Sequence, residues 1–138
     1  MGGFELLEHT ADVGILASGD TLDEALAWVA TGMFSVIADL DRVDARDQIE
    51  VTVESADGDA LVVDWLNELL YRHEAEGFLP CEFAVTVDAA GASLTATCGG
   101  ERVDAARHGW LDTVKAATYH KLDVSHDGEW RLRVFLDV

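Results

Sequence analysis

The chain has 138 residues, of which 49% are hydrophobic, and this size and composition are typical of one folded domain over residues 1–138. It carries 27 Asp and Glu residues against nine Lys and Arg, a formal net charge of −18 at pH 7. Because such a surface repels phosphate backbones, we expect no direct nucleic-acid binding through a basic patch. We interpret the acidity either as adaptation to high salt or as a docking surface for a basic protein partner.

No part of the sequence is typical of a membrane or secreted protein. Charged residues interrupt every apolar stretch before it is long enough to cross a bilayer. The N-terminus lacks a basic region followed by an apolar core, so we expect a cytoplasmic protein. A cytoplasmic location disfavours a disulfide, and Cys81 and Cys98 lack metal-binding spacing, so both are expected to be small buried hydrophobic residues.

The first predicted feature is a strand, a polar turn and a second strand over residues 4–16. Two apolar runs flank a short polar stretch that contains His9, Thr10 and Asp12. Apolar runs favour buried strands, whereas these three side chains supply hydrogen-bonding or metal-binding groups. The simplest interpretation is that Asp12 caps the turn through its side chain.

Two amphipathic helices follow. The first is predicted from Thr21 to about residue 38, because Thr21 and Glu24 form a capping box and apolar residues then recur at helical spacing. The second is predicted to start near Asp57 and to end at Gly77.

The remaining segments predict strands. Residues 49–54, between the helices, alternate apolar and polar side chains. Residues 80–98 predict a hairpin in which Phe83 faces Ala96, and the alternation also allows a register shifted by two residues.

Residues 118–138 predict a second hairpin around a three-residue loop with Gly128 left-handed. This loop places Val124 opposite Trp130 and a favourable charge pair, Asp123 with Arg131, on the solvated face. The order of all elements indicates an α+β fold, a largely antiparallel sheet with two helices packed on one face.

The end of the last strand is the first candidate site. In the predicted register Asp137 lies beside Ala117, with Lys115 one diagonal step away. If the turn containing Asp12 reaches the same place, oxygens of Asp12, Asp137 and the C-terminal Val138 converge. Hard oxygen ligands of this kind suit Ca²⁺ or Mg²⁺.

The segment 114–120 is the second candidate. Lys115 and His120 are suited to contacting a phosphate or a partner's carboxylate; the simpler interpretation is a strand of small residues in which His120 is a structural hydrogen-bonding group. His108 is expected at the surface. The sequence lacks a glycine-rich phosphate loop and a nucleophile motif, which favours a binding or activating role over catalysis.

Four segments together resemble the archease family. They are residues 8–14, 61–71, 114–120 and 135–138. The resemblance implies a small α+β fold built on a strand-helix-strand-strand module. It also implies a protein cofactor of the RtcB-type RNA ligase of tRNA splicing, which promotes ligase guanylylation and multiple turnover, broadens nucleotide triphosphate use and has no turnover of its own.

The resemblance also implies functional residues. The family's Ca²⁺-type metal site matches Asp12, Asp137 and Val138, the last through a terminal or main-chain oxygen. Lys115 matches the family's lysine motif and is the expected contact to the ligase. We place His9 and His120 beside Lys115 as residues of partner contact or activation.

Two other functions remain open at this stage. One is a small metal-dependent phosphoryl-transfer or hydrolytic enzyme, with Asp12 and Asp137 as metal ligands and His9 or His120 as base. The other is a chaperone-like interaction module, for which the acidic surface would suffice.

Overall fold

A computed structural model describes residues 2–8 and 12–138 of the protein. The elements of this part of the chain are, in order, β1 (Gly3–Glu8), β2 (Val13–Gly19), α1 (Leu22–Ile37), a 3₁₀ turn (Leu40–Arg42), β3 (Asp47–Glu54), α2 (Gly58–Glu76), β4 (Phe78–Val87), β5 (Ser93–Arg102), α3 (Ala105–His108), β6 (Ala116–Asp127) and β7 (Glu129–Asp137). Among the described residues, no helix has the length and apolar character needed to cross a membrane.

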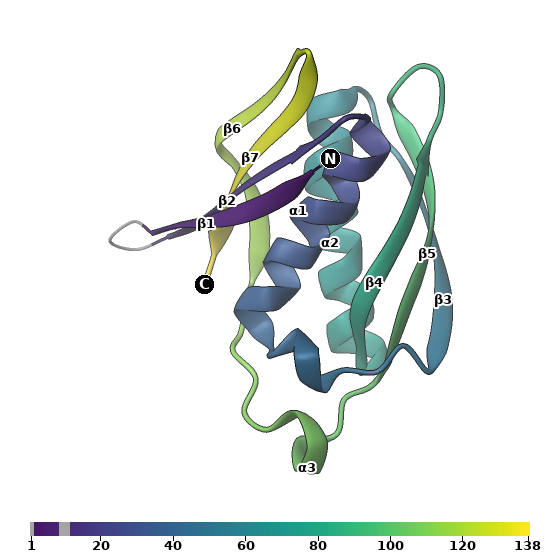
Figure 1. The fold of residues 1–138 in the computed structure, drawn as a ribbon, viewed down its shortest axis with the longest axis vertical. Helices are drawn as coiled ribbons and strands as arrows, with labels where there is room; N and C mark the ends of the chain where they lie inside the picture. The colour runs from purple at the N-terminus through teal and green to yellow at the C-terminus, as the bar shows by residue number, and fades with distance from the viewer. Residues whose placement is uncertain (1, 9–11) are drawn as a thin grey trace.

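The strands form two antiparallel sheets with the long helices between them (Figure 1). The four-stranded sheet has the order β1-β2-β7-β6, and the three-stranded sheet has the order β3-β5-β4. Helix α1 contacts β2 on one side and β4 on the other, and α2 likewise contacts β6 and β3. The α+β class with antiparallel pairing is therefore confirmed, but two sheets replace the single sheet that was expected.

The buried surface of the helices explains the second sheet. A helix that covers one sheet buries a single stripe. In α2 the buried residues cover more than one stripe, because they are Leu61, Val62, Val63, Trp65, Leu66, Leu69 and Leu70. The two helices are joined directly, since the indole Nε1 of Trp65 donates a hydrogen bond to the carbonyl of Leu26 (3.0 Å).

The two long helices begin and end close to the residues predicted from the sequence. The backbone N–H of Glu24 donates to the Thr21 hydroxyl (3.1 Å) at the start of α1. At the start of α2 the Asp57 carboxylate accepts from the N–H of Ala60 (2.8 Å), and Gly77 ends the helix in the left-handed conformation (φ 66°). These caps satisfy backbone groups that a helix leaves unpaired at its ends.

The β4–β5 hairpin adopts the register shifted by two residues, in which Phe83 pairs with Cys98. The loop is longer than a two-residue turn because the Asp88 carboxylate accepts hydrogen bonds from the N–H groups of Ala92 and Ser93 (3.0 and 3.1 Å). Cys98 is buried, as expected, whereas Cys81 is only half-buried.

The β6–β7 hairpin turns around Gly128, which is left-handed as predicted (φ 79°). It closes one residue later than expected, so Val124 pairs with Leu132 and the predicted partner of Val124, Trp130, pairs with His126. The rings of His126 and Trp130 stack with 4.3 Å between centroids, which stabilises this closure.

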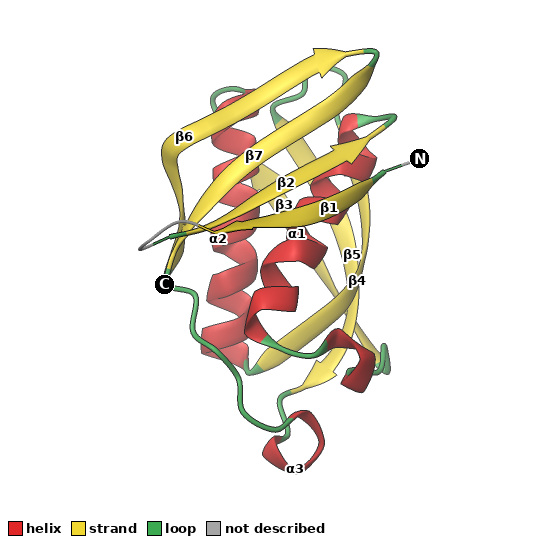
Figure 2. Ribbon diagram, turned by 60° about the vertical axis from the view of Figure 1, so that its left-hand side comes forward, coloured by secondary structure: helices red, strands yellow, loops and turns green. Residues whose placement is uncertain are grey.

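The predicted pair Asp123–Arg131 is also wrong, because Asp123 pairs with Arg133. Further along, β6 contains a large bulge: from Thr118 to Asp123 it advances five residues, while β7 moves two, from Phe135 to Arg133. The three extra residues bend β6 sharply (Figure 2).

The connection from β5 to β6 crosses from one sheet to the other and is held by a buried carboxylate. Glu101 at the end of β5 accepts hydrogen bonds from the N–H of Asp44 (2.8 Å) and from Nε2 of His108 (3.0 Å), and it pairs with Arg107. The N–H of Asp104 donates to Nδ1 of His108 (2.9 Å), so the neutral ring carries its proton on Nε2. His108 is only 4% exposed, so the expectation of a surface residue was wrong.

These contacts predict a specific pH dependence of stability. The N–H of Asp44 and the side chains of His108 and Arg107 lower the pKa of Glu101 from 4.5 to about 2. A lowered native pKa stabilises the fold above pH 4.5, and this contribution is lost as the pH falls towards 2. The unfolding free energy of the wild type should therefore exceed that of Glu101→Gln above pH 4.5, with the difference shrinking towards pH 2.

Chemical denaturation at a series of pH values measures this difference. Glu74→Gln, at an exposed position of α2, is the matched control and should follow the wild type throughout. A constant offset between wild type and Glu101→Gln across the range would contradict the assignment.

Candidate functional site

The paired ends of β2 and β7 place the two predicted carboxylates opposite each other. Val13 pairs with Leu136, so one residue further along the same antiparallel register Asp12 lies across from Asp137. On its other side Asp137 pairs with Ala116 of β6, one residue from the predicted partner Ala117. Asp12 is half-buried and Asp137 is exposed.

The four-stranded sheet has one face that points away from the helices, here called the outer face (Figure 2). Strand alternation places both carboxylates on it, because the core side chains of β2 and β7 lie at the alternate positions. The residues of β7 that belong to the core are Leu132, Val134 and Leu136. Because successive side chains of a strand point to opposite faces, the outer face of β7 carries Arg131, Arg133, Phe135 and Asp137. Phe135 is 4% exposed although it lies outside the core cluster.

Lys115 lies at the same end of the sheet. Its backbone N–H donates to the carbonyl of Asp137 (2.8 Å), so the predicted proximity of Lys115 to Asp137 is present. Its side chain is exposed, and no carboxylate of the described residues lies within ion-pair distance of it. His120 lies further along β6 in the bulge, with its ring 6.4 Å from that of Phe135. His9 lies outside the described residues.

Asn67 of α2 fixes the strand segment that follows Lys115. Its Nδ2 donates to the carbonyl of Ala117 (3.2 Å), and the N–H of Ala117 donates back to its Oδ1 (2.8 Å). Since β6 is an edge strand of its sheet, the amide satisfies backbone groups that no neighbouring strand reaches. Asn67 therefore couples the helix layer to the segment that carries Lys115.

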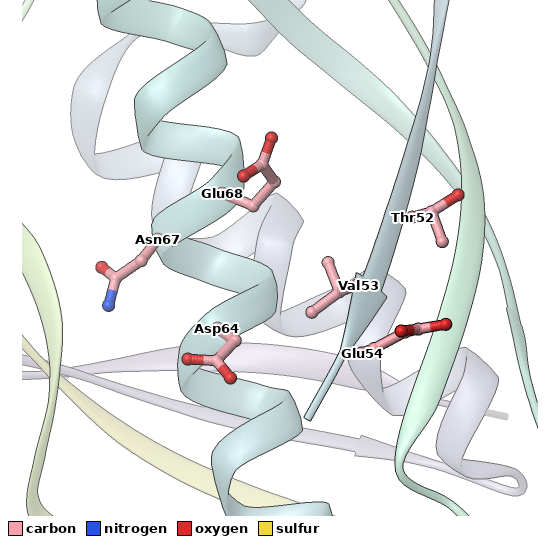
Figure 3. Close-up of a pocket in the computed structure, with 6 residues that line it drawn as sticks. All are labelled: Thr52, Val53, Glu54, Asp64, Asn67 and Glu68. Carbon is pink, nitrogen blue, oxygen red and sulfur yellow. The ribbon is translucent and has the colours of Figure 1, made fainter. Parts of the chain in front are cut away.

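A shallow groove of about 410 Å³ lies between α2 and β3 (Figure 3). Its lining residues are Thr52, Val53, Glu54, Asp64, Asn67 and Glu68. Figure 3 shows Asn67 projecting from the side of α2 away from β3, consistent with its bonds to Ala117. Asp64 accepts a hydrogen bond from the Ser55 hydroxyl (2.7 Å). None of the residues predicted for the site lines this groove.

The donor chemistry at Asp12 and Asp137 suits a hard divalent cation. Two carboxylates at adjacent strand ends repel each other unless a cation lies between or beside them. The described part of the chain contains no group of three His, Cys, Asp or Glu side chains placed to hold a metal. Asp12 and Asp137 would therefore supply only part of a coordination shell, and main-chain oxygens, water or a partner would have to complete it.

Comparison with known proteins assigns the chain to a family. The pattern of the Archease protein family (MTH1598/TM1083) matches residues 4–138. The chain belongs to the archease family. It is 37% identical over 142 residues to the protein archease of Pyrococcus abyssi and 38% identical over 141 residues to that of Methanothermobacter thermautotrophicus, and each match covers 100% of both chains.

A solved structure shares the fold of this archease-family chain. It is the solution structure of Methanobacterium thermoautotrophicum protein 1598, which superposes with a TM-score of 0.84 at 36% sequence identity. The match covers 99% of each chain. The resemblance seen in the four sequence segments is thus confirmed over nearly the whole chain.

Two features of the site escaped prediction from sequence. The link between Asn67 and Ala117 joins residues 50 positions apart, and the sequence gives no local signal for it, because Asn67 is one of several polar residues in α2. The bulge in β6 contains Lys121 in a left-handed conformation (φ 54°), which Asn, Asp and Gly favour and Lys does not.

We predict that Asn67→Ala loosens the segment carrying Lys115. The substitution leaves the N–H and carbonyl of Ala117 without these partners, which should cost about 1–3 kcal/mol of stability. Hydrogen exchange should speed up at residues 115–118 more than elsewhere in β6. The matched control is Asn67→Asp, which keeps the acceptor for the Ala117 N–H and should retain protection at that amide. Uniform acceleration across the four-stranded sheet in Asn67→Ala would contradict this local role.

Proposed function

We propose that this archease-family protein activates an RtcB-type RNA ligase of tRNA splicing, and that it has no turnover of its own. In this proposal it promotes guanylylation and multiple turnover of the ligase and broadens the nucleotide triphosphates that the ligase accepts. The observation that carries the proposal is the meeting of Asp12, Lys115 and Asp137, from three distant parts of the chain, at one end of one sheet. Family membership supports it independently.

The acidic end of the sheet is the proposed metal site. Asp12 and Asp137 would hold Ca²⁺ or another hard divalent cation, with Val138 adding a main-chain or terminal oxygen. The ion would supply positive charge that neutralises the carboxylates and attracts further oxygen ligands from the partner. The described residues would supply only a few of the ligands that such an ion needs. Because Asp137 is exposed, a partner could reach the ion and complete its coordination shell.

Lys115 is the proposed charged contact to the ligase. Its backbone N–H is bonded to Asp137, and Ala117, two residues further along, is bonded to Asn67, so the main chain is fixed at Lys115 and just after it while the side chain is exposed. A fixed backbone lowers the entropy lost when the side chain engages a partner carboxylate or phosphate. His9 and His120 are proposed as accompanying contacts.

A guanylylation assay tests this function. Purified ligase is incubated with GTP, with and without this protein, in single-turnover and multiple-turnover conditions. Wild type should stimulate both, and Asp12→Asn, Asp137→Asn and Lys115→Ala should each reduce stimulation by about tenfold or more, since each removes a charged contact.

Matched controls lie at other exposed positions. Asp59→Asn, in the first turn of α2, and Arg102→Ala, at the end of β5, remove the same kinds of charge and should stimulate like wild type. Full stimulation by the Asp12 and Lys115 variants would refute the proposal, and so would nucleic-acid joining by this protein without ligase.

Metal binding makes a separate prediction. A ligand that binds only the folded state stabilises it, by about 2.7 kcal/mol at a hundred times its Kd. Ca²⁺ should therefore raise the Tm of wild type, with a smaller or no rise in Asp12→Asn and Asp137→Asn. The Asp59→Asn control should respond like wild type. Equal rises in all four proteins would place the ion elsewhere on the acidic surface.

A further inference from the structure

Some Lys and Arg side chains of this chain form ion pairs with carboxylates, and others do not. With 27 carboxylates against nine Lys and Arg, a carboxylate partner is available for nearly every cation. The cations within 4.0 Å of a carboxylate are Arg42, Arg46, Arg72, Arg107 and Arg131. Within the described chain Arg102, Lys115, Lys121 and Arg133 have none. Three of these four belong to the four-stranded sheet or lead directly into it.

The bulge in β6 fixes Lys121. This residue has a left-handed backbone (φ 54°), a conformation that L side chains rarely adopt. Its ammonium nitrogen lies 5.8 Å from the centroid of the Phe135 ring, a cation–π contact on the outer face. Strained backbone of this kind persists only where surrounding contacts hold it, and it is concentrated at binding sites.

Arg133 supplies one of those contacts. Its Nε donates to the carbonyl of Lys121 (3.1 Å), so the guanidinium is bound to the bulge by one of its N–H groups. In the described part of the chain its two terminal nitrogens have no hydrogen-bond partner. These two terminal nitrogens form the guanidinium fork, which normally binds two oxygens of a carboxylate or phosphate. The fork of Arg133 therefore remains available beside the ammonium of Lys121.

The ring of Phe135 lies beneath Lys121 and packs against Gly14 of β2. A Cβ atom at position 14 would lie 2.9 Å from Cε1 of Phe135, so the absence of a side chain allows the ring to lie close against β2. The ring is almost fully buried and supports the ammonium above it. Asp137 lies two residues further along β7, so the cationic pair adjoins the acidic end of the same face.

We propose that Lys121 and the terminal nitrogens of Arg133 form a binding site for a phosphate group. A phosphate has enough oxygens to accept from both the fork and the ammonium, and two negative charges to match two cations. A single carboxylate would satisfy only one of them. Asp123 lies opposite Arg133 in the strand register, but no described carboxylate lies within 4.0 Å of either cation. This site does not depend on the ligase role, because it is formed by the isolated protein.

The phosphate has two possible sources, a nucleoside triphosphate and the terminal phosphate of an RNA. Both offer the same group to Lys121 and Arg133. The strongly negative surface disfavours a long nucleic-acid chain, but a terminal phosphate needs only this small area. The two sources are distinguished by experiment.

The test is a titration of the ¹⁵N-labelled protein with inorganic pyrophosphate, followed by NMR at low ionic strength, where screening is weak. Wild type should show saturable shifts at the amides of residues 119–122 and at the Arg133 Nε. GTP and two short RNAs, one ending in a phosphate and one in a hydroxyl, are titrated in the same way. Saturation by GTP alone identifies a nucleotide, and saturation only by the phosphorylated RNA identifies an RNA end.

The variants are chosen to retain the fold of the bulge. Lys121→Gly removes the ammonium and suits the left-handed backbone, while Arg133→Gln removes the charge and keeps an N–H donor for the Lys121 carbonyl. Each should weaken pyrophosphate binding by about tenfold or more. Arg131→Gln is the matched control, because Arg131 lies on the same face of β7 but pairs with Glu129, and it should bind like wild type.

Two results would overturn the proposal. One is the absence of saturable shifts at residues 119–122 with pyrophosphate. The other is equal weakening by Arg131→Gln, which would show that the anion responds to overall charge and not to this pair. Because the assay contains no ligase, failure here leaves the proposed ligase activation standing, and failure of activation leaves this site standing.

Discussion

The antiparallel pairing of β2 with β7 is the constraint on which the site depends. It buries Ile15, Leu132 and Val134 against the helices, and a slip of one residue would turn these side chains to the outer face. The same register leaves Asp12 across from Asp137. The apolar core and the carboxylate pair are thus set by the same strand register, so the register that buries the core also determines where the proposed metal site lies.

The outer face of the four-stranded sheet brings opposite charges close together, and only some of them form ion pairs. Asp12 and Asp137 occupy one end, and the bulge sets Lys121 and Arg133 further along the same strands. The chain has a net charge of −18, yet neither Lys121 nor Arg133 has a described carboxylate within 4.0 Å. The left-handed backbone at Lys121 and the bond from Arg133 to its carbonyl hold the two cations beside each other. A metal site and a phosphate site side by side would suit a partner whose own chemistry involves phosphates and divalent ions.

Local signals predicted much of this structure. Capping residues such as Thr21 and Asp57 act within one helical turn, so both long helices were predicted from sequence. Features set by distant contacts were not predicted: the second sheet follows from how broadly the helices are buried, and the β6–β7 closure from stacking of His126 on Trp130. Lys115 lies close to Asp137 as predicted, but two unpredicted features produce this proximity. The β6–β7 hairpin closes one residue later than expected, and the bulge in β6 shifts the register back in the opposite direction.

The most direct test of the central claim is a hydrogen-exchange footprint of this protein bound to an RtcB-type ligase. The account requires that the partner cover the outer face at its charged end. Slower exchange is predicted at residues 12–16, 115–122 and 133–137, with little change in β3 and β4 of the other sheet. Protection confined to the three-stranded sheet or to the groove between α2 and β3 would contradict the account.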